Sequence, residues 1–276
     1  MTGSEGASAA PAWMPSALLA WFGETARDLP WRKTHDPYAI LVSEVMLQQT
    51  QVARVLERYE RWLERWPTPE ALAAAPAADV LREWSGLGYN RRALSLQNAA
   101  RRVVELGGFP RELAALEQLP GIGPYTARAI ACFAFGAQVT ALDTNVRRVL
   151  ERSLGTTAVE PPPGRAWDWN QALFDLGAQV CLARVPRCDR CPLAEGCPSR
   201  GLTFAPLRRQ SRFEGSRRQR RAALVRELAG GPRDDRGYDR DVVESLLADG
   251  LAVRRADGLL ALPEEATDAT TASRPP

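Results

Sequence analysis

The sequence is almost devoid of histidine and lysine. Among its 276 residues His35 is the one histidine and Lys33 the one lysine, so arginine carries nearly all of the positive charge. A Ser–His–Asp triad or a histidine-rich metal site would depend on His35, which lies in a turn-like stretch before Asp36 and Pro37. A Schiff-base enzyme would depend on Lys33. Both kinds of enzyme are therefore poor candidates.

Long apolar runs are also missing. No stretch approaches the roughly 18 apolar residues that a membrane-spanning helix needs. The first basic residue is Arg27, so the charged-then-apolar order of a signal peptide is absent. Apolar residues make up 45% and charged residues 25% of the chain, as in an average globular protein. These values exclude a wholly disordered chain and a membrane protein, and we expect a cytoplasmic protein.

The net charge of +3 is small, but its distribution is uneven. Between residues 208 and 221 there are seven arginines and a single acid, Glu214. A run of this kind is typical either of a solvated linker or of a segment that binds phosphates. The arginines are Arg208, Arg209, Arg212, Arg217, Arg218, Arg220 and Arg221.

The five cysteines are the strongest signal in the composition. Cys132 stands alone in an apolar stretch and is expected in the core. In a reducing compartment, clustered cysteines are metal ligands more often than disulfides. Zinc usually takes two short C-x2-4-C pairs, and here only Cys188 and Cys191 form one, so the spacing favours an iron–sulfur cluster over zinc. The clustered residues, in the spacing C-x6-C-x2-C-x5-C, are Cys181, Cys188, Cys191 and Cys197.

Helical periodicity dominates the chain up to residue 200. The apolar pattern predicts a first helix around 18–22 and one long second helix over 40–56. No alternating run of β-branched residues interrupts this pattern, so the main body is predicted to be all-α. Further helices, separated by proline and glycine, are expected over 91–106, 126–135, 144–150 and 167–181.

The composition changes after Cys197, where a linker leads into the arginine run. Two short helices followed by a hairpin of two short strands are expected, and this order suggests a small winged-helix-like module. The chain ends, 1–12 and 263–276, are expected to be disordered. The elements predicted for the module are helices over 217–228 and 240–248 and strands over 251–253 and 259–261.

The segment Leu119-Pro120-Gly121-Ile122-Gly123 lies between two helical patterns. Two glycines on either side of one apolar residue form a tight hairpin whose backbone N–H groups open the next helix. Glycine is required because a side chain would block close approach to a phosphate. The motif indicates DNA-backbone binding by Gly121, Ile122 and Gly123, with an ordinary helix–helix turn as the alternative.

Together, this hairpin, Asp143 downstream of it and the four-cysteine loop resemble the helix-hairpin-helix DNA glycosylases that carry a 4Fe-4S cluster. Three segments are similar to the A/G-specific adenine DNA glycosylases, the MutY family: 29–32, 43–52 and 86–89. The resemblance covers residues 15–200 and implies a two-lobed, all-α fold. The implied domains are a glycosylase core over 13–204, with a six-helix lobe at about 36–136 and a cluster lobe at about 13–30 plus 142–200, and then a basic linker and module over 205–262.

Glu44 is the candidate general acid. In a helix its neighbours three and four positions away include Ile40, Leu41 and Leu47, so its side chain leaves from a largely apolar face. A carboxylic acid on such a face is expected to stay protonated at neutral pH, as a general acid must. A surface glutamate near a helix bend is the alternative on pattern alone. The resemblance implies that Glu44 protonates N7 of the flipped adenine.

Asp143 precedes a helical segment, so the pattern alone predicts an N-cap. N–H donors at a helix start keep a carboxylate ionised. The resemblance implies that Asp143 stabilises, or traps covalently, the oxocarbenium ion formed as the base leaves, which is the division of labour in glycoside hydrolysis. It also implies that Asn145 helps to hold the sugar and water.

Tyr125 follows Gly123 and Pro124, where packing at the hairpin is the simple explanation. The resemblance places its hydroxyl against the catalytic carboxylates, at a position where related enzymes with lyase activity carry lysine. With tyrosine there and Lys33 as the one lysine, a monofunctional glycosylase is expected.

The resemblance also assigns an adenine pocket and the residues that fill the vacated base stack. Trp31 and Leu47 could equally belong to the core, and Tyr89 could be a simple turn aromatic. Many relatives carry glutamate at the position of Asp175. Unstacking a mispaired base costs less than unstacking a paired one, which supplies part of the selectivity. The pocket comprises Arg27, Trp31, Arg32, Leu47 and Asp175, and the stack-filling residues are Gln48, Gln49 and Tyr89.

The resemblance implies a monomeric base excision repair enzyme that removes adenine opposite guanine or 8-oxoguanine from double-stranded DNA and is nucleoid-associated when on DNA. A thymine glycosylase acting on G·T mispairs and a non-catalytic iron–sulfur DNA-binding protein are the alternatives. Relatives that prefer 8-oxoguanine usually add a larger β-rich domain with a Phe-Ser-His reader, whereas no histidine follows His35 here. The arginine run and the small module are expected to supply general phosphate binding instead.

Overall fold

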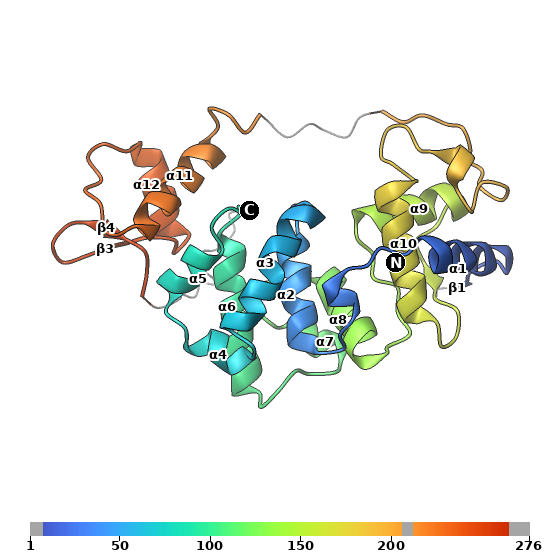
Figure 1. The fold of residues 1–276 in the computed structure, drawn as a ribbon, viewed down its shortest axis with the longest axis horizontal. Coiled ribbons are helices and arrows are strands. Elements are labelled where there is room, and N and C mark those ends of the chain that lie inside the picture. Colours follow the sequence, from blue (N-terminus) through green and yellow to red (C-terminus); the bar gives the residue numbers. More distant parts are fainter. Residues whose placement is uncertain (1–7, 206–211, 265–276) are drawn as a thin grey trace, which may run out of the picture. The chain divides into compact units, whose positions relative to one another are not determined.

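The computed structural model describes residues 8–205 and 212–264, which are mostly helical (Figure 1). This confirms the predicted all-α class. Within these two ranges no helix is long and apolar enough to span a membrane. The two-residue strands are β1 (Ser8–Ala9), β2 (Val159–Glu160), β3 (Val253–Arg254) and β4 (Leu260–Ala261). The helices are α1 (Trp13–Thr25), α2 (Pro37–Leu47), α3 (Val52–Arg65), α4 (Pro69–Ala74), α5 (Ala77–Glu83), α6 (Arg91–Glu105), α7 (Leu113–Glu117), α8 (Pro124–Phe135), α9 (Thr144–Leu154), α10 (Ala166–Gln179), α11 (Arg217–Ala229) and α12 (Arg240–Ala248).

The chain divides into two compact units, each built from segments that are far apart in the sequence. Asp143 and the four clustered cysteines belong to the first unit, and Glu44 belongs to the second together with the C-terminal module. The first unit comprises residues 1–40, 111–114 and 123–209, and the second comprises residues 41–110, 115–122 and 210–276.

The core of the first unit is formed by α1, α9 and α10. Apolar residues recur every three or four positions in these helices, which gives each of them an apolar stripe to bury. Met14 of α1, Leu150 of α9 and Trp169 of α10 are fully buried in one cluster. This shared core fixes the start of α9, which follows Asp143, and the end of α10, which precedes Cys181.

Strand β1 departs from the expectation that residues 1–12 are disordered. Ser8 pairs in parallel with Val159 of β2, and the Ser8 N–H donates to the carbonyl of Ala158 at 3.0 Å. A pairing of two residues leaves no alternating pattern in the sequence, and its partner lies far along the chain, so local periodicity could not reveal it. Residues 1–7 lie outside the described part of the chain.

The second unit buries a cluster of tryptophans. Trp62 packs edge-on against Trp66 and Trp84, with ring centroids 4.7 and 5.5 Å apart. Both α4 and α5 pack on α6, whose buried Gln97 donates from its amide to the carbonyl of Leu72 at 3.1 Å. Buried carbonyls need such donors, so Gln97 fixes the end of α4 against α6.

The prediction of one long helix over 40–56 is wrong, because the chain breaks between α2 and α3. Gln49 has a φ of +54°, in the left-handed region that interrupts a helix. The guanidinium of Arg92 donates to the carbonyls of Val45 at 2.6 Å and Gln48 at 2.7 Å, which the end of α2 leaves without helical partners. Apolar side chains continue on both sides of the break, so the periodicity conceals it.

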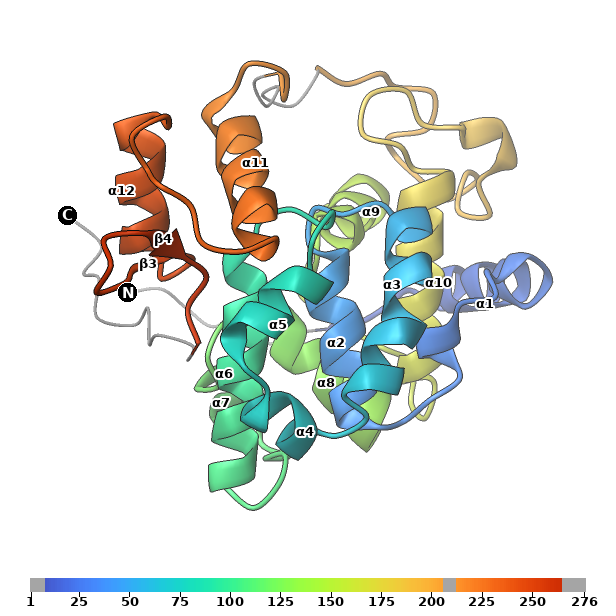
Figure 2. The same cartoon turned by 60° about the vertical axis from the view of Figure 1, so that its left-hand side comes forward.

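The C-terminal module matches its prediction closely. Helices α11 and α12 pack side by side and precede the antiparallel β3–β4 hairpin (Figure 2). Leu224 and Val225 of α11 and Leu246 of α12 are buried between the elements of the module. The helical spacing of these apolar residues is strong enough to define both helices from the sequence.

The module is attached to α5 of the second unit. Arg82 Nε donates to the carbonyl of Ala229 at 3.0 Å, and the Ala77 N–H donates to the carbonyl of Glu264 at 2.8 Å. The second contact involves the start of the segment 263–276 that is expected to be disordered. Residues 265–276 of that segment lie outside the described residues, as do Arg208 and Arg209 of the arginine run.

Candidate active site and cysteine cluster

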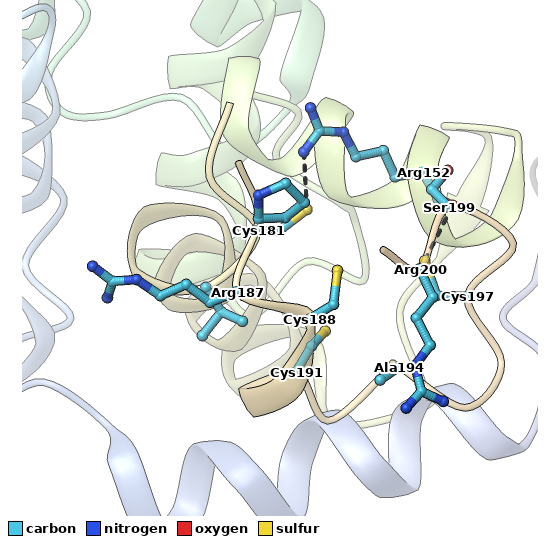
Figure 3. A pocket seen from close by; sticks show the side chains of 11 residues that line it. Arg152, Cys181, Arg187, Cys188, Cys191, Ala194, Cys197, Ser199 and Arg200 are labelled. Atoms are coloured by element: carbon cyan, nitrogen blue, oxygen red, sulfur yellow. Dashed lines mark hydrogen bonds between the residues drawn. The ribbon is translucent and has the colours of Figure 1, made fainter. Parts of the chain in front are cut away.

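The four clustered cysteines line one pocket of the first unit (Figure 3). Cys181 follows the end of α10, Cys188 opens a single 3-10 turn and Cys191 closes it. Burial raises the pKa of the Cys191 thiol to about 11. In the described ranges, no three His, Cys, Asp or Glu side chains group as they would around one metal ion. Cys132 is buried elsewhere, as predicted.

Two N–H groups face sulfur atoms of this pocket. Arg152 Nη1 lies 3.6 Å from the sulfur of Cys181 and 2.8 Å from the carbonyl of Leu182, and the Gly201 N–H lies 3.4 Å from the sulfur of Cys188. The Arg152 guanidinium also stacks on Phe204, with its carbon 3.5 Å from the ring centroid. Such donors stabilise thiolates more than thiols, so they suit a site for metal-bound sulfur.

Asp143 caps the N-terminus of α9, which confirms the prediction from pattern. Its Oδ1 accepts the N–H of Val146 at 2.6 Å, and its Oδ2 accepts the amide of Asn145 at 2.9 Å. The amide oxygen of Asn145 accepts Arg148 Nη2 at 2.9 Å, and Arg148 Nε donates to the carbonyl of Cys181 at 2.9 Å. Hydrogen bonds therefore connect the Asp143 carboxylate to the backbone of the first cysteine.

Asp175 of α10 is fully buried and is held by two arginines. Arg32 donates to its two oxygens at 2.7 and 2.9 Å, and Arg27 Nε donates at 2.6 Å. Burial acts to raise the pKa of this carboxyl, but Arg32 and Arg27 together hold it below its ordinary value. Both oxygens are thus engaged by arginine, so Asp175 orients Arg27 and Arg32. Sequence reasoning did not anticipate this ion pair.

The other two residues predicted to line the adenine pocket differ in their burial. Trp31 is buried in the first unit and Leu47 is half-buried at the end of α2. The Nε of Arg32 is buried and finds no hydrogen-bond partner among the described residues. A buried donor of this kind carries a desolvation cost unless a ligand or water meets it.

Glu44 lies on α2 with 6% of its surface exposed, so the prediction that it leaves from a buried face is confirmed. Ile40 and Leu41, one turn earlier on the helix, are almost completely buried. Tyr125 is half-buried near the start of α8, and its ring packs edge-on against Phe174 with centroids 6.1 Å apart. This ring contact supports the interpretation that Tyr125 packs at the glycine hairpin.

The glycine hairpin lies between α7 and α8, as predicted. Gly121 has a φ of +74°, and a Cβ there would lie 2.7 Å from the Cβ of Ser95. Glycine is therefore required at this position by backbone conformation and by close packing. Ile122 is buried, while Gly121 and Gly123 are exposed. The buried isoleucine anchors a turn whose backbone is open to a phosphate.

The residues predicted to fill the vacated base stack lie on two strained loops of the second unit. Gln49 and Tyr89, with φ of +54° and +48°, are the two non-glycine residues with positive φ in the described ranges, and both are exposed. Gln48 beside them is half-buried. Strained backbone of this kind persists only where the surroundings hold it, and it concentrates at functional sites.

Arg92 is the residue that holds these loops together, and sequence reasoning missed it. Besides the carbonyls at the end of α2, it donates from Nη2 to Thr50 Oγ1 at 3.1 Å and to the carbonyl of Gly88 at 3.1 Å. Its guanidinium carbon lies 5.6 Å from the ring centroid of Tyr89. Burial lowers the pKa of Arg92 to about 10. In the sequence, the one indication of this role is that Arg92 lies one turn after the Gly-Leu-Gly-Tyr segment at 86–89.

Replacement of Arg92 by methionine is expected to lower the free energy of unfolding by about 3 kcal/mol, because several buried carbonyls lose their donor. Lysine should restore little, since it lacks the planar fork that reaches both loops. Chemical denaturation measures the change. The matched control is Arg102→Met on the same helix, where an exposed ion pair with Glu105 is lost and less than about 0.5 kcal/mol is expected. An equal loss of unfolding free energy in both variants would contradict the role of Arg92 in holding the two loops together.

Comparison with known proteins defines the class. Residues 42–164 match the family model of the HhH-GPD superfamily base excision DNA repair proteins. The structure of a thermostable thymine-DNA glycosylase is similar, with a TM-score of 0.63 and 31% identity over 67% of this chain and 94% of that chain. The helical fold and the glycine hairpin are those of a helix-hairpin-helix base excision repair protein.

Two individual relatives indicate which family within this class the chain resembles. The adenine DNA glycosylase of Mycobacterium tuberculosis is 41% identical over 90% of this chain and 93% of its own length. The adenine DNA glycosylase of Homo sapiens is 44% identical over 67% of this chain and 39% of its own length. The chain belongs to the adenine DNA glycosylase family.

Proposed function

We propose that this protein is a monofunctional DNA glycosylase that hydrolyses the N-glycosidic bond of adenine mispaired with guanine or 8-oxoguanine. It acts as a monomer on double-stranded DNA. The observation that carries the proposal is the burial of a glutamate, Glu44, in the segment 43–52 that is similar to adenine-specific enzymes. Relatives named adenine DNA glycosylase are 41% and 44% identical to the chain, against 31% for the thymine-DNA glycosylase, which favours adenine over thymine.

The proposed chemistry divides between two carboxyl groups with different roles. Glu44 gives its proton to N7 of the adenine, so that the base leaves as a neutral molecule when the C1′–N9 bond breaks and its electron pair moves to the ring. Asp143, whose carboxyl oxygens accept the N–H of Val146 and the amide of Asn145, stabilises the positive charge left on the sugar. Water then adds at C1′ and gives a proton to the Glu44 carboxylate, which yields an abasic site and restores the acid.

The ion pair at Asp175 has a supporting role in this scheme. Asp175 fixes Arg27 and Arg32 beside Trp31, and these residues form the wall of the adenine pocket. The unpartnered Nε of Arg32 is a donor suited to a ring nitrogen of the base.

The four cysteines bind a 4Fe-4S cluster in this proposal. The donor set fits, because a cubane cluster takes one thiolate for each of its irons and all four cysteines line one pocket. The N–H groups of Arg152 and Gly201 would stabilise the sulfur ligands. When bound, the cluster supplies a covalent cross-link of the loop after α10, which couples metal ligation to folding.

The absence of an active-site lysine predicts an intact DNA strand after excision. The one lysine, Lys33, is exposed and pairs with Asp28 at 2.7 Å. The resemblance places Tyr125 at the position where lyases carry lysine. The abasic product should break only after alkali or heat, as seen by denaturing gel electrophoresis. A borohydride-trapped adduct of enzyme and DNA as abundant as the released base would contradict this, and Lys33→Ala would then identify the amine.

The proposal is tested by identifying the released base. Chromatography of a reaction on an A·G duplex should show free adenine. Free thymine from a G·T duplex, with no adenine from the A·G duplex, would favour the thymine alternative instead.

A further inference from the structure

Each of the two strained loops holds one exposed side chain on left-handed backbone. The α2–α3 loop, residues 48–51, carries Gln49, and the α5–α6 loop, residues 84–90, carries Tyr89. Neither residue is glycine, so its backbone conformation is unfavourable unless neighbouring groups stabilise it. Because both side chains are exposed, their burial does not provide this stabilisation. It must come from contacts with the backbone around them.

One guanidinium reaches the peptide bond that precedes each left-handed residue. Arg92 Nη1 donates to the carbonyl of Gln48 at 2.7 Å, and Arg92 Nη2 donates to the carbonyl of Gly88 at 3.1 Å. A carbonyl shares its peptide plane with the nitrogen of the next residue, so a donor that holds the carbonyl also restrains the φ of that next residue. Arg92 therefore acts on Gln49 and Tyr89 through equivalent atoms.

The two terminal nitrogens of Arg92 are divided between the loops. Nη1 also lies 3.1 Å from the carbonyl of Met46 at the end of α2, and Nη2 lies 3.3 Å from the carbonyl of Leu87 in the α5–α6 loop. The guanidinium is planar, so these nitrogens keep a fixed separation. Capping of α2 would account for the contacts of Nη1 but not for those of Nη2. Arg92 therefore holds the two loops at a defined distance from each other.

Two neighbouring side chains reinforce this arrangement. Trp84 is fully buried and donates from Nε1 to the carbonyl of Gly88 at 3.0 Å, and its ring centroid lies 5.1 Å from the guanidinium carbon of Arg92. The Thr50 hydroxyl accepts from Arg92 Nη2 and lies 3.5 Å from the carbonyl of Leu87. Thr50 thus joins the α2–α3 loop to the α5–α6 loop beside Arg92.

The exposed side chains of the two loops suit insertion into a base stack. The ring of Tyr89 is available to the face of a base, since the residue is 43% exposed, and the amide of Gln49 can offer both donors and acceptors to the base left unpaired. Loops and side chains that become ordered only on binding lose conformational entropy at that step. The contacts of Arg92 order both residues before DNA is bound.

We propose that Arg92 is a positioning residue that holds Gln49 and Tyr89 as one preformed wedge and thereby speeds extrusion of the target base from the duplex. The proposal rests on the proposed function and on the prediction that these two residues fill the space that the adenine leaves. Extrusion requires unstacking of the base, and a wedge that is already ordered can occupy the gap without a further ordering step. Arg92 itself transfers no proton and does not touch the reacting atoms.

The first test measures extrusion without excision. The target adenine is replaced by 2-aminopurine opposite guanine, whose fluorescence rises when it leaves the stack, and the enzyme carries Glu44→Gln so that the base stays attached. Arg92→Lys keeps the charge but not the planar fork, and it should slow the rise at saturating enzyme by about thirtyfold. The matched control is Arg102→Lys, an exposed arginine on the same helix, which should leave the rate unchanged.

Thr50→Val is the second variant, and it keeps the test decisive if Arg92→Lys does not fold. Valine has the shape of threonine but lacks the hydroxyl that accepts from Arg92, so extrusion should slow by about threefold. A wild-type rate in Arg92→Lys would show that charge alone suffices and would overturn the proposal. If Arg92→Lys does not fold, a wild-type rate in Thr50→Val overturns it.

Amide hydrogen exchange tests the clamp independently of DNA. The reporters are the N–H groups of Thr50 and Leu87, which donate within their own loops to the carbonyls of Leu47 at 3.2 Å and Trp84 at 3.1 Å. In Arg92→Lys both should exchange at least about tenfold faster, because the two loops lose one shared restraint. Faster exchange in one loop alone, or in neither, would contradict a wedge held as one unit.

Adenine release by the wild-type chain from an A·G duplex is measured alongside. If the wild type releases adenine and Arg92→Lys extrudes 2-aminopurine at the wild-type rate, the proposal for Arg92 alone fails. If the wild type releases no adenine, the proposed function fails. The fluorescence and exchange measurements then still decide whether Arg92 holds a wedge that extrudes a base, because neither of them depends on excision.

Discussion

Replacement of Glu44 by glutamine is expected to lower the single-turnover rate of adenine excision by at least about a hundredfold. Glutamine keeps the size and the hydrogen-bonding capacity of the side chain but has no proton to transfer to N7. The side chain is 6% exposed on α2, so water cannot readily take over its role. The affinity for duplex DNA should change little, because the substitution neither adds nor removes a phosphate contact.

A matched control is Glu60→Gln, an exposed glutamate on the neighbouring helix α3 that should leave the rate unchanged. Single-turnover kinetics with enzyme in excess separate the chemical step from binding and product release. Full activity of Glu44→Gln would end the assignment of Glu44 as the general acid. A loss of binding without a loss of rate would make Glu44 a binding residue.

The wild-type protein is expected to hold about four iron atoms per chain and to absorb broadly in the visible range, and replacement of Cys191 by serine is expected to remove most of that iron. The loop after α10 should then loosen, because ligation and folding are coupled. The rate of adenine excision should fall as well, because Arg148 connects this loop to the site of Asp143. Arg148 donates to the carbonyl of Cys181 and to the amide oxygen of Asn145 beside Asp143. Iron analysis and thermal unfolding measure the two effects.

Cys132→Ala is the control for the loss of a cysteine outside the pocket. Cys132 is buried in the first unit, and burial raises the pKa of its thiol to about 11, so it stays a neutral thiol. Its replacement should cost about 1 kcal/mol of stability through lost packing and should leave the iron content unchanged. Stoichiometric zinc without iron in protein purified in the absence of oxygen would contradict the cluster assignment.

Elements with a strong apolar period could be predicted from the sequence. Helices α11 and α12 begin at the predicted residues because their buried leucines and valines recur at helical spacing. The cap at Asp143 could also be predicted, because capping is a local interaction between a carboxylate and the next turn. The apolar helix face that carries Glu44 could be predicted for the same reason, because its neighbours one turn away in the helix are also close in sequence.

Features set by distant partners could not be predicted. The break after α2 depends on Arg92, which comes from the start of α6, and no local pattern announces it. The pairing of Asp175 with Arg27 and Arg32 joins α10 to the segment after α1 across more than a hundred residues of sequence. Strand β1 likewise exists because β2 lies beside it. In each case the partner is chosen by tertiary packing, which periodicity does not encode.

The measurement that tests the central claim most directly is single-turnover base excision by the wild-type chain on four duplexes, which carry A·8-oxoG, A·G, T·G and thymine glycol. The account predicts release of adenine from the first two duplexes and of no base from the other two. Release of thymine from the T·G duplex without release of adenine would show a thymine glycosylase. Binding to all four duplexes without release of any base would show a DNA-binding protein and would contradict the account.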